Sequence, residues 1–412
     1  MSVLVARCAM PLWLSANSTK SNTPLIPIRY NLRSLMVRRA TSVMTASVVA
    51  LVVMILFILS GFAAGLRATV MRTAGGNNWI VLSRGTTDEG GSFISREQYE
   101  IIKSRSQIAT TPDGQPLVSP EIINGFNPNP EAPPTAGNVF TTLRGIYPIA
   151  YQVHRDMRIE NGRWPNRGSA EMVVGRKLAA RYHNLAIGSD FRFGRRTWKI
   201  VGTFSDHDSA RESEVLTDLD VLAQDIHMKN GFAVLHVVLR PGQQTDFGKS
   251  LTTDSRVRVD TESEQEYYAK QTEFIDQLYS MGLVVALILA IGSIFGAMNT
   301  MYSAVARRTS EIGVLRVLGF SRVNVLLSFV IESIMLALAG GILGEMLGIL
   351  VAYSTGLSSE LMNVGEFIFR FRLTSGAFLS GMVAAIAIGA IGGFLPAWRA
   401  SRIAVTESLR AV

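Results

Sequence analysis

Four long apolar stretches constrain this sequence more than any other feature. They cover residues 40–66, 277–306, 323–353 and 375–395, and apart from two glutamates in the third they contain no charged residue. About 20 consecutive apolar residues are enough for a helix to cross a bilayer. The composition agrees, because 48% of the 412 residues are hydrophobic and only 17% are charged. The sequence therefore predicts four membrane-spanning helices.

The excess positive charge lies on three short segments. Segment 1–42 has six basic residues and no acid, 299–322 has four against one, and 396–412 has three against one, whereas 67–273 has 25 of each sign. Short basic segments stay on the cytoplasmic side of a membrane. The net charge of +8 is thus a sign of topology, and we do not expect a nucleic-acid partner.

The predicted order follows from these two patterns. It comprises a cytoplasmic N-terminal segment (1–42), a first membrane helix (43–66), an extracytoplasmic domain (67–273), a second helix (274–306), a cytoplasmic segment (307–322), a third helix (323–353), an outer loop (354–373), a fourth helix (374–395) ending at Pro396, and a cytoplasmic tail (396–412). We interpret residues 1–27 as a flexible extension. With Cys8 as the single cysteine, neither an intrachain disulfide nor a cysteine metal site is expected.

The extracytoplasmic segment is predicted to be an α/β domain in two parts. A strand at 79–82 precedes a helix that Ser95 and Gln98 open as a capping box. Seven prolines in 110–137 should break regular structure before a second, mostly β part. Strands at 232–239 and 256–259 return to the first part, and one strand is expected at 367–373. We further expect strands at 140–146, 171–174, 191–193 and 198–204.

Residues 261–281 are predicted to form one helix that projects above the bilayer as a stalk. Aromatic and apolar side chains recur on one of its faces at helical spacing. Exposed aromatic residues at that height would be explained by contact with a second copy of the chain. The proposed contact residues are Tyr267, Gln271, Phe274 and Leu278.

The segment between the second and third membrane helices is basic and amphipathic. Ile312, Leu315 and Leu318 fall at roughly helical spacing, and Gly319 should end the helix. Such a helix either docks on a partner or lies on anionic lipid.

Here the sequence resembles the MacB/FtsX-like family of ABC transporter permeases. In that family the same segment carries an Arg-x-x-Glu-Ile-Gly-x-Leu-Arg motif that docks on a separate ATPase. The motif is matched within MNTMYSAVARRTSEIGVLRVLGFSR by Arg308, Glu311, Ile312, Gly313, Leu315 and Arg316, beside Arg307. Weaker similarity to MacB-type periplasmic core domains runs through 143–148, 161–164, 173–175, 198–202 and 212–215. The tail resembles the family at 397–400 and 407–410 but departs from it at Ala404 and Val405.

The resemblance implies an α+β membrane protein with four transmembrane helices and a two-subdomain α/β domain inserted between helices 1 and 2. It also implies a bacterial inner-membrane location, a homodimer, two copies of an ABC ATP-binding subunit that supplies ATP and Mg²⁺, and in some members a periplasmic adaptor. Both termini would then be cytoplasmic.

Other polar and small residues have more than one interpretation. Glu332 and Glu345 lie in the third helix, where an acid is costly; either could face a substrate cavity, or Glu332 could bond a neighbouring helix and Glu345 could reach the interface. Glycines spaced by four (Gly340, Gly344 and Gly348; Gly389 and Gly393) suit packing within one chain or a dimer interface equally. Asp206, His207 and Asp208 are too close in sequence to converge easily on one ion, so no metal is expected.

Three classes of function differ in how well the sequence supports them. The first is a permease that couples ATP hydrolysis by a separate ATPase to an extracytoplasmic movement (mechanotransmission) for export or release of a substrate. The second is an FtsX-type regulator of a cell-wall hydrolase without transport; the two-part domain favours the first. The third, a membrane-anchored sensor or enzyme, lacks support because the sequence has no Walker A, HExxH or nucleophile-elbow pattern.

The topology can be tested by labelling. In a Cys8→Ala background, an impermeant thiol reagent applied to intact cells should label a cysteine at Ser92 or Ser359 but not one at Ser310. Labelling at 310 without labelling at 92 would reverse the predicted orientation.

Overall fold

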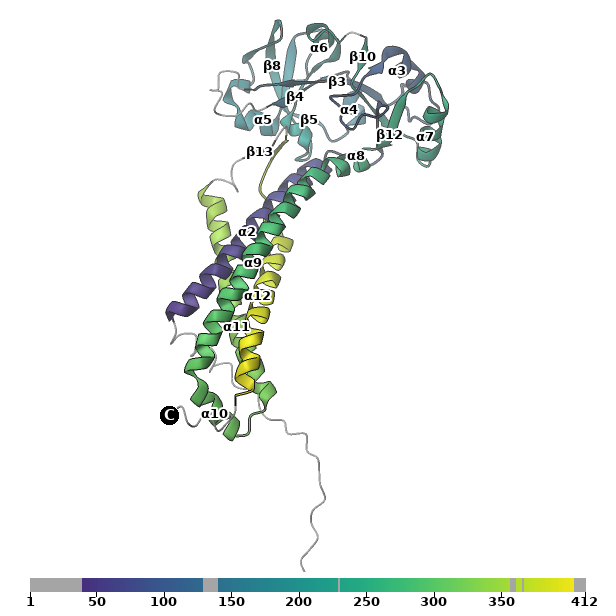
Figure 1. The fold of residues 1–412 in the computed structure, drawn as a ribbon. Coiled ribbons are helices and arrows are strands. Elements are labelled where there is room, and N and C mark those ends of the chain that lie inside the picture. Colours follow the sequence, from purple (N-terminus) through teal and green to yellow (C-terminus); the bar gives the residue numbers. More distant parts are fainter. Residues whose placement is uncertain (1–38, 129–139, 229, 356–360, 365–366, 404–412) are drawn as a thin grey trace, which may run out of the picture. The chain divides into compact units, whose positions relative to one another are not determined.

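The computed structural model describes residues 39–128, 140–228, 230–355, 361–364 and 367–403 (Figure 1). Within them four helices are long and apolar enough to cross a membrane, which confirms the prediction. The shortest has 27 residues, or about 40 Å at 1.5 Å per residue, against a hydrocarbon core of about 30 Å. They are α2 (Arg39–Met71), α9 (Glu273–Arg307), α11 (Arg322–Ser354) and α12 (Ser375–Ser401).

The chain divides into two compact units. The first comprises residues 1–48, 291–340 and 385–412, and the second comprises 49–290 and 341–384. The predictions for residues 1–27 and for the tail at 407–410 lie outside the described residues.

Glycines let the helices approach closely inside each unit. A Cβ added to Gly344 of α11 would lie 2.4 Å from the Ala50 carbonyl oxygen of α2, in the second unit. In the first unit, a Cβ on Gly389 of α12 would lie 2.7 Å from Cβ of Ala337 on α11. Gly344 and Gly389 therefore allow close packing of helices within one chain. The same holds for Gly348 and Gly393.

A mixed ten-stranded sheet forms the core domain between α2 and α9. The strand order is β12-β1-β11-β3-β4-β9-β6-β8-β5, with β7 paired to β8, and only β4/β9 and β6/β8 are parallel pairs. The strands are β1 (Asn78–Ser83), β3 (Val118–Phe126), β4 (Thr141–Ile146), β5 (Arg158–Gly162), β6 (Glu171–Gly175), β7 (Asp190–Phe193), β8 (Arg196–Ser205), β9 (Val215–Asp218), β11 (Val234–Val238) and β12 (Val259–Ser263).

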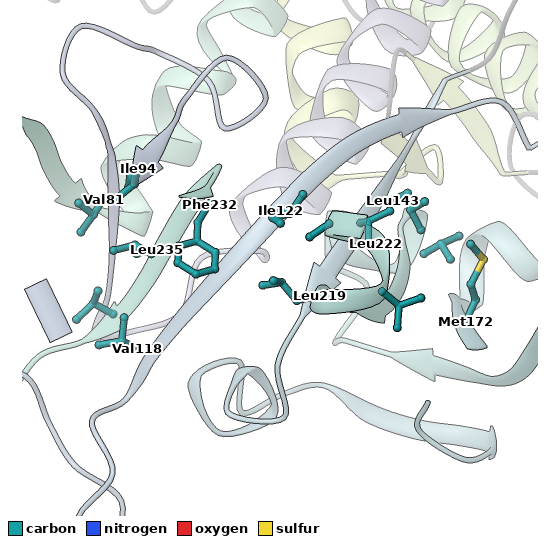
Figure 2. Close-up of a cluster of buried hydrophobic side chains, with 14 of the residues drawn as sticks. Val81, Ile94, Val118, Ile122, Leu143, Met172, Leu219, Leu222, Phe232 and Leu235 are labelled. Carbon is teal, nitrogen blue, oxygen red and sulfur yellow. The ribbon is translucent and has the colours of Figure 1, made fainter. Parts of the chain in front are cut away.

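The two halves of this sheet meet on β3. Residues 118–121 of β3 pair with β11, whereas residues 122–126 pair with β4. Ile122 lies at the change of partner and is fully buried. In the buried hydrophobic cluster, Val118 and Leu235 lie on one side of Ile122, and Leu222 and Met172 lie on the other (Figure 2). The domain is therefore in two parts, as predicted, but one strand belongs to both.

Short helices, a small two-stranded sheet and one hairpin complete the domain. The predicted capping box is confirmed: the backbone N–H of Gln98 donates to Ser95 Oγ, and that of Ser95 donates to Gln98 Oε1, at the start of α3 (Arg96–Lys103). The two-stranded sheet pairs β2 (Ile94–Ser95) with β10 (Gly231–Phe232), and the hairpin pairs β13 (Met362–Val364) with β14 (Phe367–Phe369). The helices are α4 (Ala150–Val153), α5 (Arg176–Arg181), α6 (Leu219–Asp225), α7 (Gln244–Thr253), α8 (Glu264–Gln271) and the 3₁₀ turns η2 (His183–Leu185) and η3 (Ala210–Ser213).

Three predictions about strands were wrong. The proline-rich segment contains all nine residues of β3; Pro120 is tolerated because β4 joins β3 only at Ile122, so one side of the strand at residue 120 needs no donor. The strand expected at 256–259 begins at Val259 and runs to Ser263. The outer loop holds a two-stranded hairpin, with Ile368 and Phe369 buried, in place of a single strand.

Two predictions about helices were also wrong. The helix predicted at 261–281 begins only at Glu264, because residues 261–263 belong to β12, and it is divided at a single residue, Thr272, between α8 and α9; together these form one candidate span, Glu264–Arg307. The fourth membrane helix does not stop at Pro396 but continues to Ser401. Burial of Ala397 and Ala400 in the first unit offsets the hydrogen bond that the proline removes.

Ser92 is a poor labelling site because it is 3% exposed and its Oγ accepts a hydrogen bond from the backbone N–H of Ser83. Ser104, an exposed serine of the same domain, is the better position.

Shortening Ile122 should destabilise both halves of the sheet together. Ile122→Ala is expected to cost about 2–5 kcal/mol, because it leaves a cavity where β3 changes partner. Ile187→Ala is the matched control, since Ile187 is 46% exposed and its loss should cost less than about 0.5 kcal/mol. Urea unfolding of the detergent-purified chain, followed by tryptophan fluorescence, measures both. Equal destabilisation by the two changes would contradict the central place of β3.

Candidate functional site

The segment between α9 and α11 folds as a short helix, which confirms the prediction of its structure. It is α10 (Thr309–Val317), and Leu318 is its C-cap. Gly319 has φ +93°, and its backbone N–H donates to the Arg316 carbonyl oxygen, while that of Phe320 donates to the Leu315 carbonyl oxygen. This pair of bonds is a Schellman ending, which requires a left-handed residue and so explains the glycine.

Packing divides α10 into an inner side and an outer side. Ile312 is 1% exposed and packs in a cluster that includes Phe329 and Ala397 of the same unit. The outer side carries Glu311 together with Val314, Val317 and Leu318, whose exposed fractions are 51%, 62% and 70%. We call these four residues the coupling face. The predicted apolar stripe is therefore split, because its first member faces the protein and its last faces outward.

Arg308 anchors the start of α10. Its Nη1 lies 3.1 Å from Glu332 Oε2 on α11, and its Nε lies 3.5 Å from Glu311 Oε2. The side chain of Glu332 is 2% exposed and that of Arg308 is 13% exposed, whereas that of Glu311 is 55% exposed. Arg308 thus neutralises the buried acid of α11, and Glu311 extends from the same pair to the surface.

The other motif residues have structural contacts or surface positions. Gly313 is buried beside Ile312, and Leu315 is half-buried. Arg316 Nη1 donates to the Phe320 carbonyl oxygen at 3.3 Å, so it closes the end of the helix. Arg307 is exposed at the end of α9. A docking role for these residues stays a prediction.

The two acids of α11 belong to different units, Glu332 to the first and Glu345 to the second. Glu345 is 9% exposed and its Oε1 makes no hydrogen bond within the described residues. That atom would lie 3.0 Å from a Cβ added to Gly381. Glu345 is therefore packed between helices and does not extend outward.

The predicted stalk contact needs correction at Tyr267. This residue is 5% exposed and packs against Tyr268 within its own core domain, so little of it is left for a second copy. Gln271 Nε2 donates to the Thr87 carbonyl oxygen of the same chain. Leu278 is 40% exposed, and the side chain of Phe274 lies outside the described residues.

A buried polar cluster in the core domain was missed at the sequence level. Arg144 lies 2.8 Å from both Glu121 and Glu89 and 2.6 Å from Glu214. Burial alone would raise the pKa of Glu121, but His236, His154 and Arg144 outweigh it and hold the pKa well below its usual range. Burial alone would lower the pKa of His236, yet Glu121 and Glu264 raise it. The cluster comprises Glu89, Glu121, Arg144, His154, Asp206, Arg211, Glu214, His236 and Glu264.

One sequence signal could have revealed this cluster. Arg144 and His236 stand inside runs predicted as strands, where their neighbours on both sides are apolar or small. Polar residues inside fully buried strands need partners. By contrast, the Asp206-His207-Asp208 triplet does not converge: Ser209 Oγ donates to Asp206, His207 faces Asp156 at 3.8 Å, and Asp208 pairs with Arg176.

Known proteins resemble the chain in both of its parts. The MacB-like periplasmic core domain family matches residues 42–251, and the FtsX-like permease C-terminal family matches residues 283–405. The macrolide export ATP-binding/permease protein MacB of Nitrobacter winogradskyi is 33% identical over 137 residues, which are 32% of this chain and 20% of that protein. An ABC transporter permease of Methanocaldococcus jannaschii is 24% identical over 268 residues, 61% of this chain and 65% of that one.

The chain matches only about a fifth of the length of the MacB relatives. The periplasmic region of MacB from Actinobacillus actinomycetemcomitans is similar over 49% of this chain and 94% of that region, at 15% identity and a TM-score of 0.35. Because that score is low, the assignment rests on the sequence matches, of which the first spans about half of the chain. The chain belongs to the family of ABC transporter permeases that carry a MacB-like periplasmic core domain and an FtsX-like permease domain.

Proposed function

We propose that this chain is the permease subunit of a bacterial ABC transporter and couples ATP hydrolysis by a separate ATPase to movement of its core domain. The observation that carries the proposal is the coupling face of α10, which presents an acid and three exposed apolar residues just after α9, whose residues 277–306 carry no charge. A surface of this composition suits a protein partner with an apolar groove and a basic rim. Family membership supplies the kind of partner.

The charge distribution supports an orientation. Basic segments at 1–42, 299–322 and 396–412 favour the cytoplasmic side for α10 and for both termini. The core domain is then outside, in an inner membrane that all four helices cross. An ATPase that docks on α10 is cytoplasmic, where ATP is available.

The path of the movement is α9. This helix has 35 residues, or about 52 Å at 1.5 Å per residue, and it runs from the end of the core domain to Arg307 beside α10. At its upper end, Thr272 separates it from α8, which Tyr267 and Tyr268 attach to the core domain. A push on α10 is thus delivered to the base of the sheet.

The assembly we propose contains two permeases and two ATPases. ATP and Mg²⁺ are bound by the ATPases, whose closure brings the two α10 helices together. Leu278 and neighbouring exposed residues of α9 are available for contact between the permeases. A MacB-like core domain, which the chain carries over residues 42–251, favours export or release of a substrate, with a periplasmic adaptor as a further partner, over regulation of a hydrolase.

Reversing the charge on the coupling face tests the proposal. Glu311→Lys should lower co-purification of an ABC ATPase with the tagged chain, and the stimulated ATPase rate, at least tenfold, because a charged contact that becomes buried on docking is worth about 2–5 kcal/mol. Glu100→Lys, at an exposed acid of the core domain, is the matched control and should leave both unchanged. An unchanged complex and rate with Glu311→Lys would remove the docking role.

A substitution at Arg308 serves to distinguish a defect in docking from a defect in folding. Arg308→Ala leaves Glu332 buried without this cation, so the purified chain itself should lose thermal stability. Glu311→Lys should leave the melting temperature almost unchanged, since Glu311 is largely exposed.

A further inference from the structure

Three residues of the buried polar cluster converge although they are far apart in sequence. Glu121 lies on β3, His236 lies on the neighbouring β11, and His154 is the C-cap of α4. His154 Nε2 lies 2.8 Å from Glu121 Oε1, and His236 Nε2 lies 3.6 Å from Glu121 Oε2. Their side chains are 0% to 1% exposed. The three potential ligand atoms all lie within 4.8 Å of one another.

These separations suit a metal ion. Zinc binds imidazole nitrogen and carboxylate oxygen at about 2 Å, which puts two ligands of a tetrahedral ion about 3.3 Å apart. His154 Nε2 lies 2.8 Å from Oε1 of Glu121 and His236 Nε2 lies 3.6 Å from Oε2, on either side of that value, whereas the widest separation of up to 4.8 Å must shorten when an ion binds. Two histidines and one carboxylate are also a frequent donor set for zinc, with the fourth position left to water.

An outer contact orients His236, whereas Nδ1 of His154 makes no hydrogen bond within the described residues. His236 Nδ1 lies 2.6 Å from Glu264 Oε1, so its Nε2 is the atom left for an ion. Within the described residues that Nε2 makes no hydrogen bond, although it is fully buried. A carboxylate behind a histidine is the usual outer contact of metal-binding imidazoles. Arg144 donates to Oε2 of Glu121, while Oε1 accepts a hydrogen bond from Ser119 Oγ and contacts His154 Nε2, so a bound ion would replace the contact between Oε1 and His154.

The charges of the cluster favour a cation. Five carboxylates (Glu89, Glu121, Asp206, Glu214 and Glu264) face two guanidinium groups (Arg144 and Arg211), and none of these side chains is more than 12% exposed. Uncompensated buried charge is costly. A divalent cation removes most of the imbalance.

A route to the site exists. A cavity of about 380 Å³ is lined by His154, Asp206 and Arg211 together with Asn78 and the loop at residues 72–77. It is open to solvent and lined by His154 but not by Glu121 or His236, so an ion would enter from the side of His154.

We propose that Glu121, His154 and His236 bind one divalent cation of the zinc type, with Glu264 orienting His236. Nitrogen donors select zinc, cobalt or nickel over calcium and magnesium. Glu121 is the last residue of β3 that pairs with β11 before β4 takes over at Ile122. The ion therefore ties α4, β3 and β11 together at the junction between the two halves of the core domain.

The test uses the full chain, purified in detergent with its affinity tag removed and treated with a chelator. After addition of Zn²⁺ and gel filtration, elemental analysis should find one zinc per chain, and the melting temperature should rise by roughly 5 °C. Ca²⁺ at the same concentration should leave it unchanged. No retained zinc, or an equal shift with Ca²⁺, would overturn the site.

Variants assign the ligands. His154→Ala and His236→Gln should each abolish retention of zinc, whereas His207→Gln, which removes an exposed histidine, should retain it. The reverse pattern would place the ion at the 206–208 loop and overturn the proposal. If either cluster variant fails to fold, Co²⁺ added to the unmodified chain decides, since a tetrahedral site gives strong visible absorption and its absence contradicts the assignment.

Discussion

A bilayer interior offers no hydrogen-bond partners, so a segment that crosses it must satisfy its backbone internally. Residues 277–306 carry no charge and form an unbroken part of α9. Such a helix is costly to unfold inside the membrane. Along the chain it joins the core domain to α10. The proposed coupling depends on this constraint.

Much of the fold could be predicted because its signals are local. The four helices follow from uncharged runs, α10 and its end at Gly319 follow from spacing and one glycine, and α3 follows from Ser95 and Gln98. Most strands of the core domain lie where short apolar runs predicted them. Neighbouring residues in the sequence are enough to predict these features.

The wrong predictions have a different cause, because tertiary contacts determined the structure at those positions. Burial of Ala397 and Ala400 carries α12 past Pro396, and an unpaired edge beside Pro120 lets β3 pass through a proline-rich segment. Tyr267 was expected to face a second copy but is buried in its own domain. For the candidate sites, the sequence indicates α10 but not which of its residues face outward. The convergence of Glu121, His154 and His236 has no sequence spacing that could reveal it.

The central claim is that a change at α10 moves the upper end of α9. The direct measurement is disulfide crosslinking of Leu278→Cys in a Cys8→Ala background, with the ATPase bound. Leu278 is exposed, and a disulfide forms only when the two Cα atoms come within about 7 Å. The account predicts that the yield of crosslinked dimer differs between the nucleotide-free state and a trapped ATP-bound state. An equal yield in both states would contradict transmission along α9, and no crosslink in either would contradict the dimer at this height.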